Sequence, residues 1–91
     1  MTQCVRITLV IRASDDFVRN FIQRSAQKLA LEGVSNFESQ DTIKIVASGA
    51  HNAIDEFIDL LYTGYKGLKP SIVEIEPFVK DRDYRGTFRV I

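Results

Sequence analysis

The sequence predicts an α+β fold in which two helices cover one face of a β-sheet. Residues 4–12 and 42–48 alternate between apolar and polar side chains, which is typical of strands with one buried face. Residues 17–32 and 50–63 instead repeat apolar side chains at helical spacing. The link at residues 40–41 is so short that it predicts an antiparallel hairpin between the strands on either side.

The first strand is followed directly by the first helix. Ser14, Asp15 and Asp16 lie between them and are good N-cap or first-turn residues. The helix is predicted to end near Glu32, with Gly33 as its left-handed C-cap.

Two further strands and a second helix follow. Residues 34–39 form a weaker strand and residues 42–48 a stronger one, after which Gly49 is predicted to break the pattern. The second helix should end at Gly64.

The last third of the chain adds two strands around a charged loop. Residues 71–79 alternate again, and Pro77 favours an edge or end position in the sheet. Residues 80–86 form a charged loop in which Lys80 to Arg85 are interpreted as solvated charge, and residues 87–91 can add a short last strand. The order βαββαβ with an extra C-terminal strand predicts a two-layer sandwich of ferredoxin-like type, formed by residues 1–91 as one domain.

Composition limits the classes of partner. Lys plus Arg and Asp plus Glu both number 12, so the chain has no net field to attract nucleic acid or an anionic membrane. Cys4 is the only cysteine, which fits a reducing compartment, and no apolar run approaches the roughly 20 residues of a membrane span. With no signal-peptide pattern at the start, we expect a cytoplasmic protein without membrane or nucleic-acid partners.

The helical residues also carry a sequence pattern. Residues 21–33 read Phe-Ile-Gln-Arg-Ser-Ala-Gln-Lys-Leu-Ala-Leu-Glu-Gly, the second helix carries Ala53 to Ile58, and the chain closes on Phe88-Arg89-Val90. These segments resemble the acylphosphatase family, whose first helix follows Phe-x-x-x-x-Ala-x-x-Leu-x-Leu-x-Gly and whose chain ends in Phe-x-Ile. The resemblance implies hydrolysis of the carboxyl–phosphate bond of a small acyl phosphate, without metal or cofactor.

In that family, a loop of pattern Gly-x-Val-Gln-Gly-Val-Gly-Phe-Arg holds the phosphate with its backbone amides and its final Arg. Laid on this sequence, the loop covers Ile11 to Arg19, and Arg19 falls on the signature Arg. The implied phosphate-binding residues are Ala13, Ser14, Asp15, Asp16, Phe17 and Val18. Asp15 and Phe17 replace glycines, which allow left-handed backbone angles and close approach to an anion. A carboxylate about 4 Å from a phosphate costs on the order of 1–4 kcal/mol.

The family also places an Asn on the second strand to position the attacking water. Its place falls on Phe37. Asn36 is adjacent, but neighbouring residues of a strand point to opposite faces, so it could serve only through a bulge or a register change.

The departures predict an acylphosphatase-like protein with a degenerate site and weak or no hydrolysis. Two alternatives stay open: an active acylphosphatase with an atypical phosphate loop, and a non-enzymatic module that binds a protein or a small ligand. Arg19 could also pair with Asp15 or Asp16 at helical spacing. Because Pro77 and the charged tail blunt the sheet edge, we expect a monomer.

Overall fold

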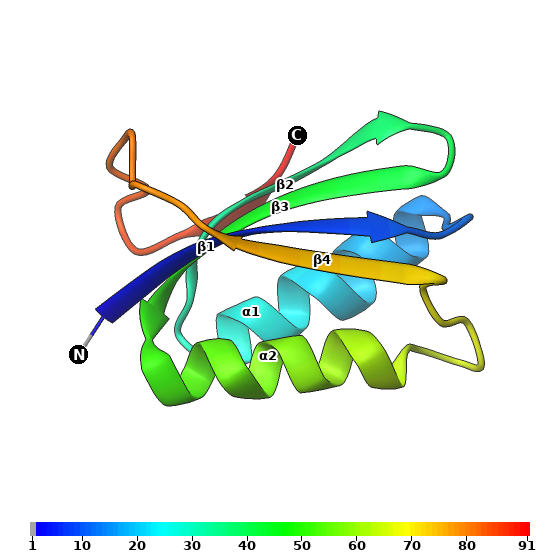
Figure 1. The fold of residues 1–91 in the computed structure, drawn as a ribbon, viewed down its shortest axis with the longest axis horizontal. Coiled ribbons are helices and arrows are strands. Elements are labelled where there is room, and N and C mark those ends of the chain that lie inside the picture. Colours follow the sequence, from blue (N-terminus) through cyan, green and yellow to red (C-terminus); the bar gives the residue numbers. More distant parts are fainter. Residues whose placement is uncertain (1) are drawn as a thin grey trace.

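The computed structural model describes residues 2–91 and shows a single layer of helices on one face of a five-stranded sheet (Figure 1). The elements are β1 (Thr2–Val10), η1 (Phe17–Gln23), α1 (Arg24–Lys28), β2 (Glu32–Ser39), β3 (Thr42–Ala50), α2 (His51–Thr63), β4 (Ile72–Pro77) and β5 (Phe88–Val90). The strand order is β4-β1-β3-β2-β5, antiparallel throughout except for the parallel pair β2–β5. The predicted α+β sandwich with an extra C-terminal strand is confirmed.

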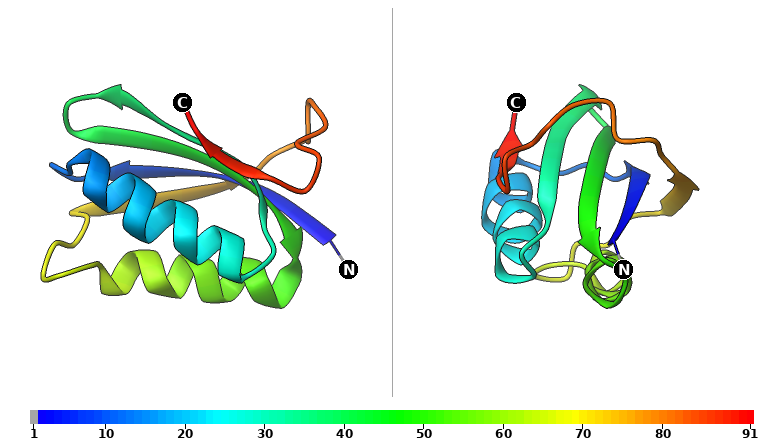
Figure 2. Two further views of the ribbon diagram at one scale, coloured as in Figure 1. Left: turned by 180° about the vertical axis from the view of Figure 1, so that it is seen from behind. Right: turned by 90° about the vertical axis from the view of Figure 1, so that its left-hand side faces the viewer.

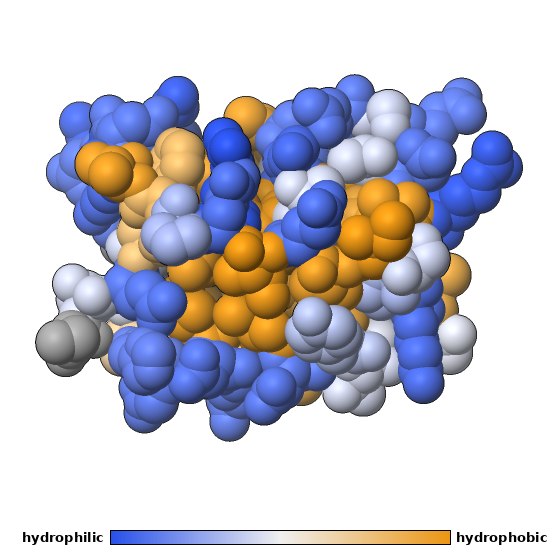
Figure 3. Space-filling view, viewed as in Figure 1, coloured by the Kyte–Doolittle hydropathy of each residue, from blue (hydrophilic) through white to orange (hydrophobic). Residues whose placement is uncertain are grey.

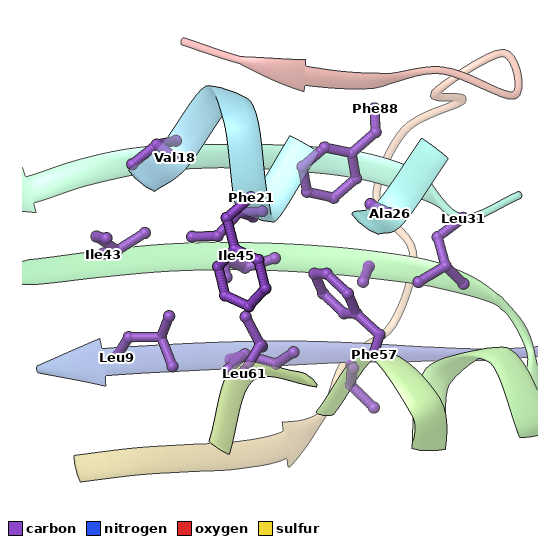
Figure 4. Packing of buried hydrophobic residues seen from close by; sticks show 14 of the residues in the cluster. Leu9, Val18, Phe21, Ala26, Leu31, Ile43, Ile45, Phe57, Leu61 and Phe88 are labelled. Atoms are coloured by element: carbon purple, nitrogen blue, oxygen red, sulfur yellow. The ribbon is translucent and has the colours of Figure 1, made fainter. Parts of the chain in front are cut away.

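The core lies between the sheet and the helices (Figures 2 and 4). On the sheet side, Leu9 pairs with Ile43 and Ile7 pairs with Ile45, and all four side chains are fully buried. The helices contribute Phe17, Val18, Phe21, Ile22, Ala26, Ile54, Phe57 and Leu61. Burial of these side chains, at about 1.5–3 kcal/mol each for a Leu, Ile or Phe, fixes both helices on the same face.

The first helical segment ends earlier than predicted. Its last helical residue is Lys28, and Ala30 takes the left-handed conformation with a φ of 56°. The Leu31 N–H donates to the Ala26 carbonyl at 2.9 Å, and the Ala30 N–H donates to the Gln27 carbonyl at 3.1 Å. These two bonds form a Schellman motif, so Ala30 and not Gly33 terminates the helix.

Gly33 and Gly49 both lie inside strands, so the predicted C-cap at Gly33 and the predicted break at Gly49 are wrong. A Cβ on Gly33 would lie 1.8 Å from the Val46 carbonyl oxygen, and one on Gly49 would lie 2.5 Å from a methyl of Leu31. Gly33 is therefore explained by the close approach of the neighbouring strand, and Gly49 by the close approach of the buried Leu31 side chain.

β4 forms one edge of the sheet, and Pro77 is its last residue, as predicted. Ile72 and Ile75 on this strand are 49% and 40% exposed. Figure 3 shows a hydrophobic band across the face that lies between β4 and α2. Within residues 2–91, no helix has the length and apolar character needed to cross a membrane.

Candidate functional site

The junction between β1 and η1 is an irregular segment of four residues, 11–14, before the chain turns helical at Asp15. The Ile11 N–H donates to the carbonyl of Asp41 at 2.8 Å, which fastens the segment to the β2–β3 turn. The Val18 N–H donates to the Ser14 carbonyl at 3.3 Å and closes the first helical turn. The junction therefore lies beside the tip of the β2–β3 hairpin (Figure 2).

Between those two bonds the backbone donors are free. Within residues 2–91, the N–H groups of residues 12–17 have no hydrogen-bond partner. No residue from 11 to 19 has a positive φ, so the observed backbone does not require the glycines that the sequence lacks. A run of free N–H groups leading into a helix favours an anion.

The polar side chains at the junction do not occupy these donors. Ser14, Asp15 and Asp16 are exposed, and no side chain caps the start of η1. The carboxylate of Asp16 instead accepts a hydrogen bond from the Asn20 side-chain amide. Asp15 and Asp16 therefore lie in the first helical turn, as expected, but no side-chain cap is formed there.

The side chains of Phe17 and Val18 lie in the hydrophobic core. Their side chains are only 2% and 0% exposed. The Phe17 ring packs edge-on against Phe21 at 5.2 Å between centroids, and Phe21 stacks on Tyr65 at the same distance. This aromatic group anchors η1 and keeps the bulky Phe17 ring away from any anion on the backbone donors.

Arg19 lies on η1 with an exposed side chain. Among residues 2–91 it makes no ion pair, so the alternative pairing with Asp15 or Asp16 is not seen. η1 is a π-helix, a form that is rare and frequent at functional sites. The Arg19 guanidinium keeps all of its donors available.

A hollow of about 400 Å³ lies between the junction and the end of β2. Its lining consists of Ala13, Asp15, Phe37, Ser39 and Gln40. The structure therefore brings Asp15 and Phe37 to one surface, while Arg19 and Asn36 are not part of that lining. The sequence gives no signal for Ser39 and Gln40 as lining residues, although it predicts Ser39 at the end of the second strand and Gln40 in the turn that follows.

Asn36 and Phe37 lie on opposite faces of the sheet. Phe37 pairs with the buried Ile43 and packs against the core, whereas Asn36 pairs with Lys44. The bulge of β2 falls between Phe37 and Ser39, beyond Asn36, so it does not turn Asn36 toward the helices. The side-chain amide of Asn36 donates to the Phe37 carbonyl at a long 3.5 Å.

Metal ligation has no support within residues 2–91, where no three His, Cys, Asp or Glu side chains gather at ligand distance. The free N–H groups of residues 12–17 and the exposed Arg19 guanidinium are groups that can bind a small anion. The Asp15 carboxylate would oppose an anion placed in the hollow that it lines.

The fold defines a class of small α+β proteins in which two helices cover one face of a five-stranded sheet. The acylphosphatase family model matches residues 17–90, and the chain belongs to that family. An acylphosphatase from Caldivirga maquilingensis is 32% identical over 85 residues, which is 90% of each chain.

Solved structures agree with this assignment. An acylphosphatase from Coxiella burnetii superposes with a TM-score of 0.86 and 27% identity, covering 99% of this chain and 93% of the other. The acylphosphatase from Bacillus subtilis gives a TM-score of 0.85 at 22% identity, covering 100% and 99% of the two chains, and shows the shared fold.

Proposed function

We propose that this acylphosphatase family member holds the phosphate of a small acyl phosphate at the β1–η1 junction and hydrolyses it weakly or not at all. One observation carries the proposal. Phe37 lines the hollow beside Asp15, at the place where the family has its water-positioning Asn, and Asn36 lies on the other face of the sheet.

Phosphate binding is supported by a positive charge and by free hydrogen-bond donors at the junction. The N–H groups of residues 12–17 and the Arg19 guanidinium are the groups that would hold the phosphate oxygens. They need no metal, since phosphoryl transfer depends mainly on positioning and on stabilising charge. Asp15 opposes the anion and lowers the affinity.

Hydrolysis needs a water held in line with the bond that breaks. The ring of Phe37 cannot donate or accept a hydrogen bond, so it cannot orient that water. Losing one preorganised donor already lowers enzyme rates by about 10²–10³-fold. The site therefore favours binding over turnover.

The test is the initial rate of benzoyl phosphate hydrolysis by the purified protein, compared with buffer and with Arg19→Ala. Arg24→Ala, which removes another exposed arginine from the neighbouring helix α1, is the matched control. We expect all four rates to agree. A rate well above buffer that Arg19→Ala abolishes and Arg24→Ala keeps would overturn the proposal.

That outcome would establish the second candidate, an active acylphosphatase with an atypical loop. The observation that favours it is the run of free N–H groups at residues 12–17, reached without a left-handed residue. The non-enzymatic binding module predicts no hydrolysis and a partner whose binding changes with Asp15 and Asp16.

Two further proposals concern the state of the protein. The proline at the end of edge strand β4 supports a monomer, which light scattering would report as a mass of 10.3 kDa. The single cysteine, Cys4, supports a cytoplasmic location, which fractionation of the source cells would test.

A further inference from the structure

A second hollow, of about 330 Å³, lies between the loop after β4 and strand β5. Arg82, Arg85 and Arg89 line it together with one acid, Asp83, and Val34 and Ile91 add apolar walls. No part of the β1–η1 junction contributes to this arginine hollow.

The arginine hollow and the junction lie at opposite ends of the sheet (Figure 2). β2 connects them, because Gly33 lines the arginine hollow and Ser39 lines the other. Six strand residues at about 3.3 Å each separate them by roughly 20 Å. One small ligand cannot fill both.

The arginine hollow concentrates positive charge on a chain whose formal net charge is +0. Among residues 2–91, Arg85 and Arg89 make no ion pair, and Arg82 reaches Asp81 only at 4.0 Å. The Asp83 carboxylate accepts the Arg85 backbone N–H at 2.8 Å, so it is engaged in holding the turn. The guanidinium groups are available to an anion.

The loop that carries these arginines is held in place before any ligand arrives. The Gly86 N–H donates to one Glu32 oxygen at 2.7 Å, and Lys80 pairs with the other. The Thr87 hydroxyl donates to the carbonyl of the buried Tyr84 at 2.7 Å. A preorganised loop loses little conformational entropy when it binds.

Arg85 occupies a backbone position that normally suits glycine. Its φ is 55°, next to Gly86 at 69°. Left-handed non-glycine residues are uncommon and tend to cluster at binding sites, where the surrounding structure holds them. Here that conformation places an arginine at the hollow.

We propose that the arginine hollow binds a small organic phosphate monoester. Guanidinium forks match the oxygens of a phosphate dianion, and several of them around one hollow favour two negative charges over one. Val34 and Ile91 offer the organic part an apolar contact that inorganic phosphate cannot use. This site does not depend on the function proposed for the junction.

The test is a titration of ¹⁵N-labelled protein with phenyl phosphate and, separately, with inorganic phosphate, followed by amide chemical shifts. Arg19→Ala is the background, because it removes the junction guanidinium and leaves the arginine hollow intact. We expect saturable shifts at Gly86, Thr87 and Arg89, with phenyl phosphate binding at least tenfold more tightly than inorganic phosphate.

Changes at the arginines that line the hollow, with one control variant, decide the assignment. In Arg85→Asn/Arg89→Gln the Kd for phenyl phosphate should rise at least tenfold, while Arg24→Ala should leave it unchanged. Asn tolerates the left-handed position, and Arg82→Gln gives a single change if the double variant does not fold. Shifts that do not saturate, equal affinity for the two phosphates, or a Kd that none of the arginine changes alters would overturn the proposal.

Discussion

Asn36 and Phe37 are adjacent in β2, yet their side chains lie on opposite faces of the sheet. Phe37 faces the helices across from the buried Ile43, and Asn36 lies opposite Lys44 on the open face. A shift of one residue would exchange them. The β2–β3 register therefore decides that an aromatic ring, and not an amide, reaches the hollow beside Asp15.

Removing the Asp15 charge should strengthen anion binding at the junction. An exposed carboxylate about 4 Å from a phosphate costs on the order of 1 kcal/mol, so Asp15→Asn should lower the Kd for inorganic phosphate about fivefold. Amide shifts of residues 12–17 measure that Kd at low salt. Asp59→Asn on α2 is the matched change and should have no effect. An unchanged Kd in Asp15→Asn would show that this carboxylate does not face the anion.

The end of the first helix offers a stability test. Ala30 holds a φ of 56°, which glycine adopts at lower cost, so Ala30→Gly should raise the free energy of unfolding by about 0.5–1 kcal/mol. Ala53→Gly, inside α2, should lower it by a similar amount. Urea denaturation measures both. Destabilisation by Ala30→Gly would contradict the left-handed cap.

Glu32 on β2 contacts Lys80 and Gly86 of the loop after β4, and these contacts should make the free energy of unfolding depend on pH. The Lys80 ammonium and the Gly86 N–H hold the pKa of Glu32 below its ordinary value. The unfolded chain therefore takes up this proton first, and the stabilisation present above about pH 4.3 is lost as the pH falls through the lower folded pKa.

Glu32→Gln should accordingly reduce the loss of unfolding free energy between pH 7 and pH 3. Urea denaturation at the two pH values measures that loss. Glu56 on α2 is exposed and makes no ion pair within residues 2–91, so Glu56→Gln should leave the loss as in the parent. Equal losses of unfolding free energy in the parent and in Glu32→Gln would contradict the lowered pKa of Glu32 as a source of this pH dependence.

The fold could be predicted because alternation and helical spacing are local properties of the sequence. The helix end could not, because Gly33 has the local signature of a C-cap while its real constraint is the Val46 carbonyl on another strand. The left-handed turn falls on Ala30, a residue type that gives no such signal.

The candidate site likewise has one part that could be predicted from the sequence and another that depends on the tertiary fold. The period of two residues in a strand already separates Asn36 from Phe37. The available backbone donors at residues 12–17 and the gathering of Arg82, Arg85 and Arg89 depend on how loops fold back on the sheet. The sequence alone indicates only solvated charge for Lys80 to Arg85.

The most direct test of the central claim is the rate of benzoyl phosphate hydrolysis by Phe37→Asn. The account predicts a gain of at least about tenfold over the parent, lost again when Arg19→Ala is added, because an amide then faces the hollow and can hold a water. Asn36→Ala should leave the parent rate unchanged. A parent that already hydrolyses the substrate rapidly, with no gain from Phe37→Asn and a loss from Asn36→Ala, would contradict the account.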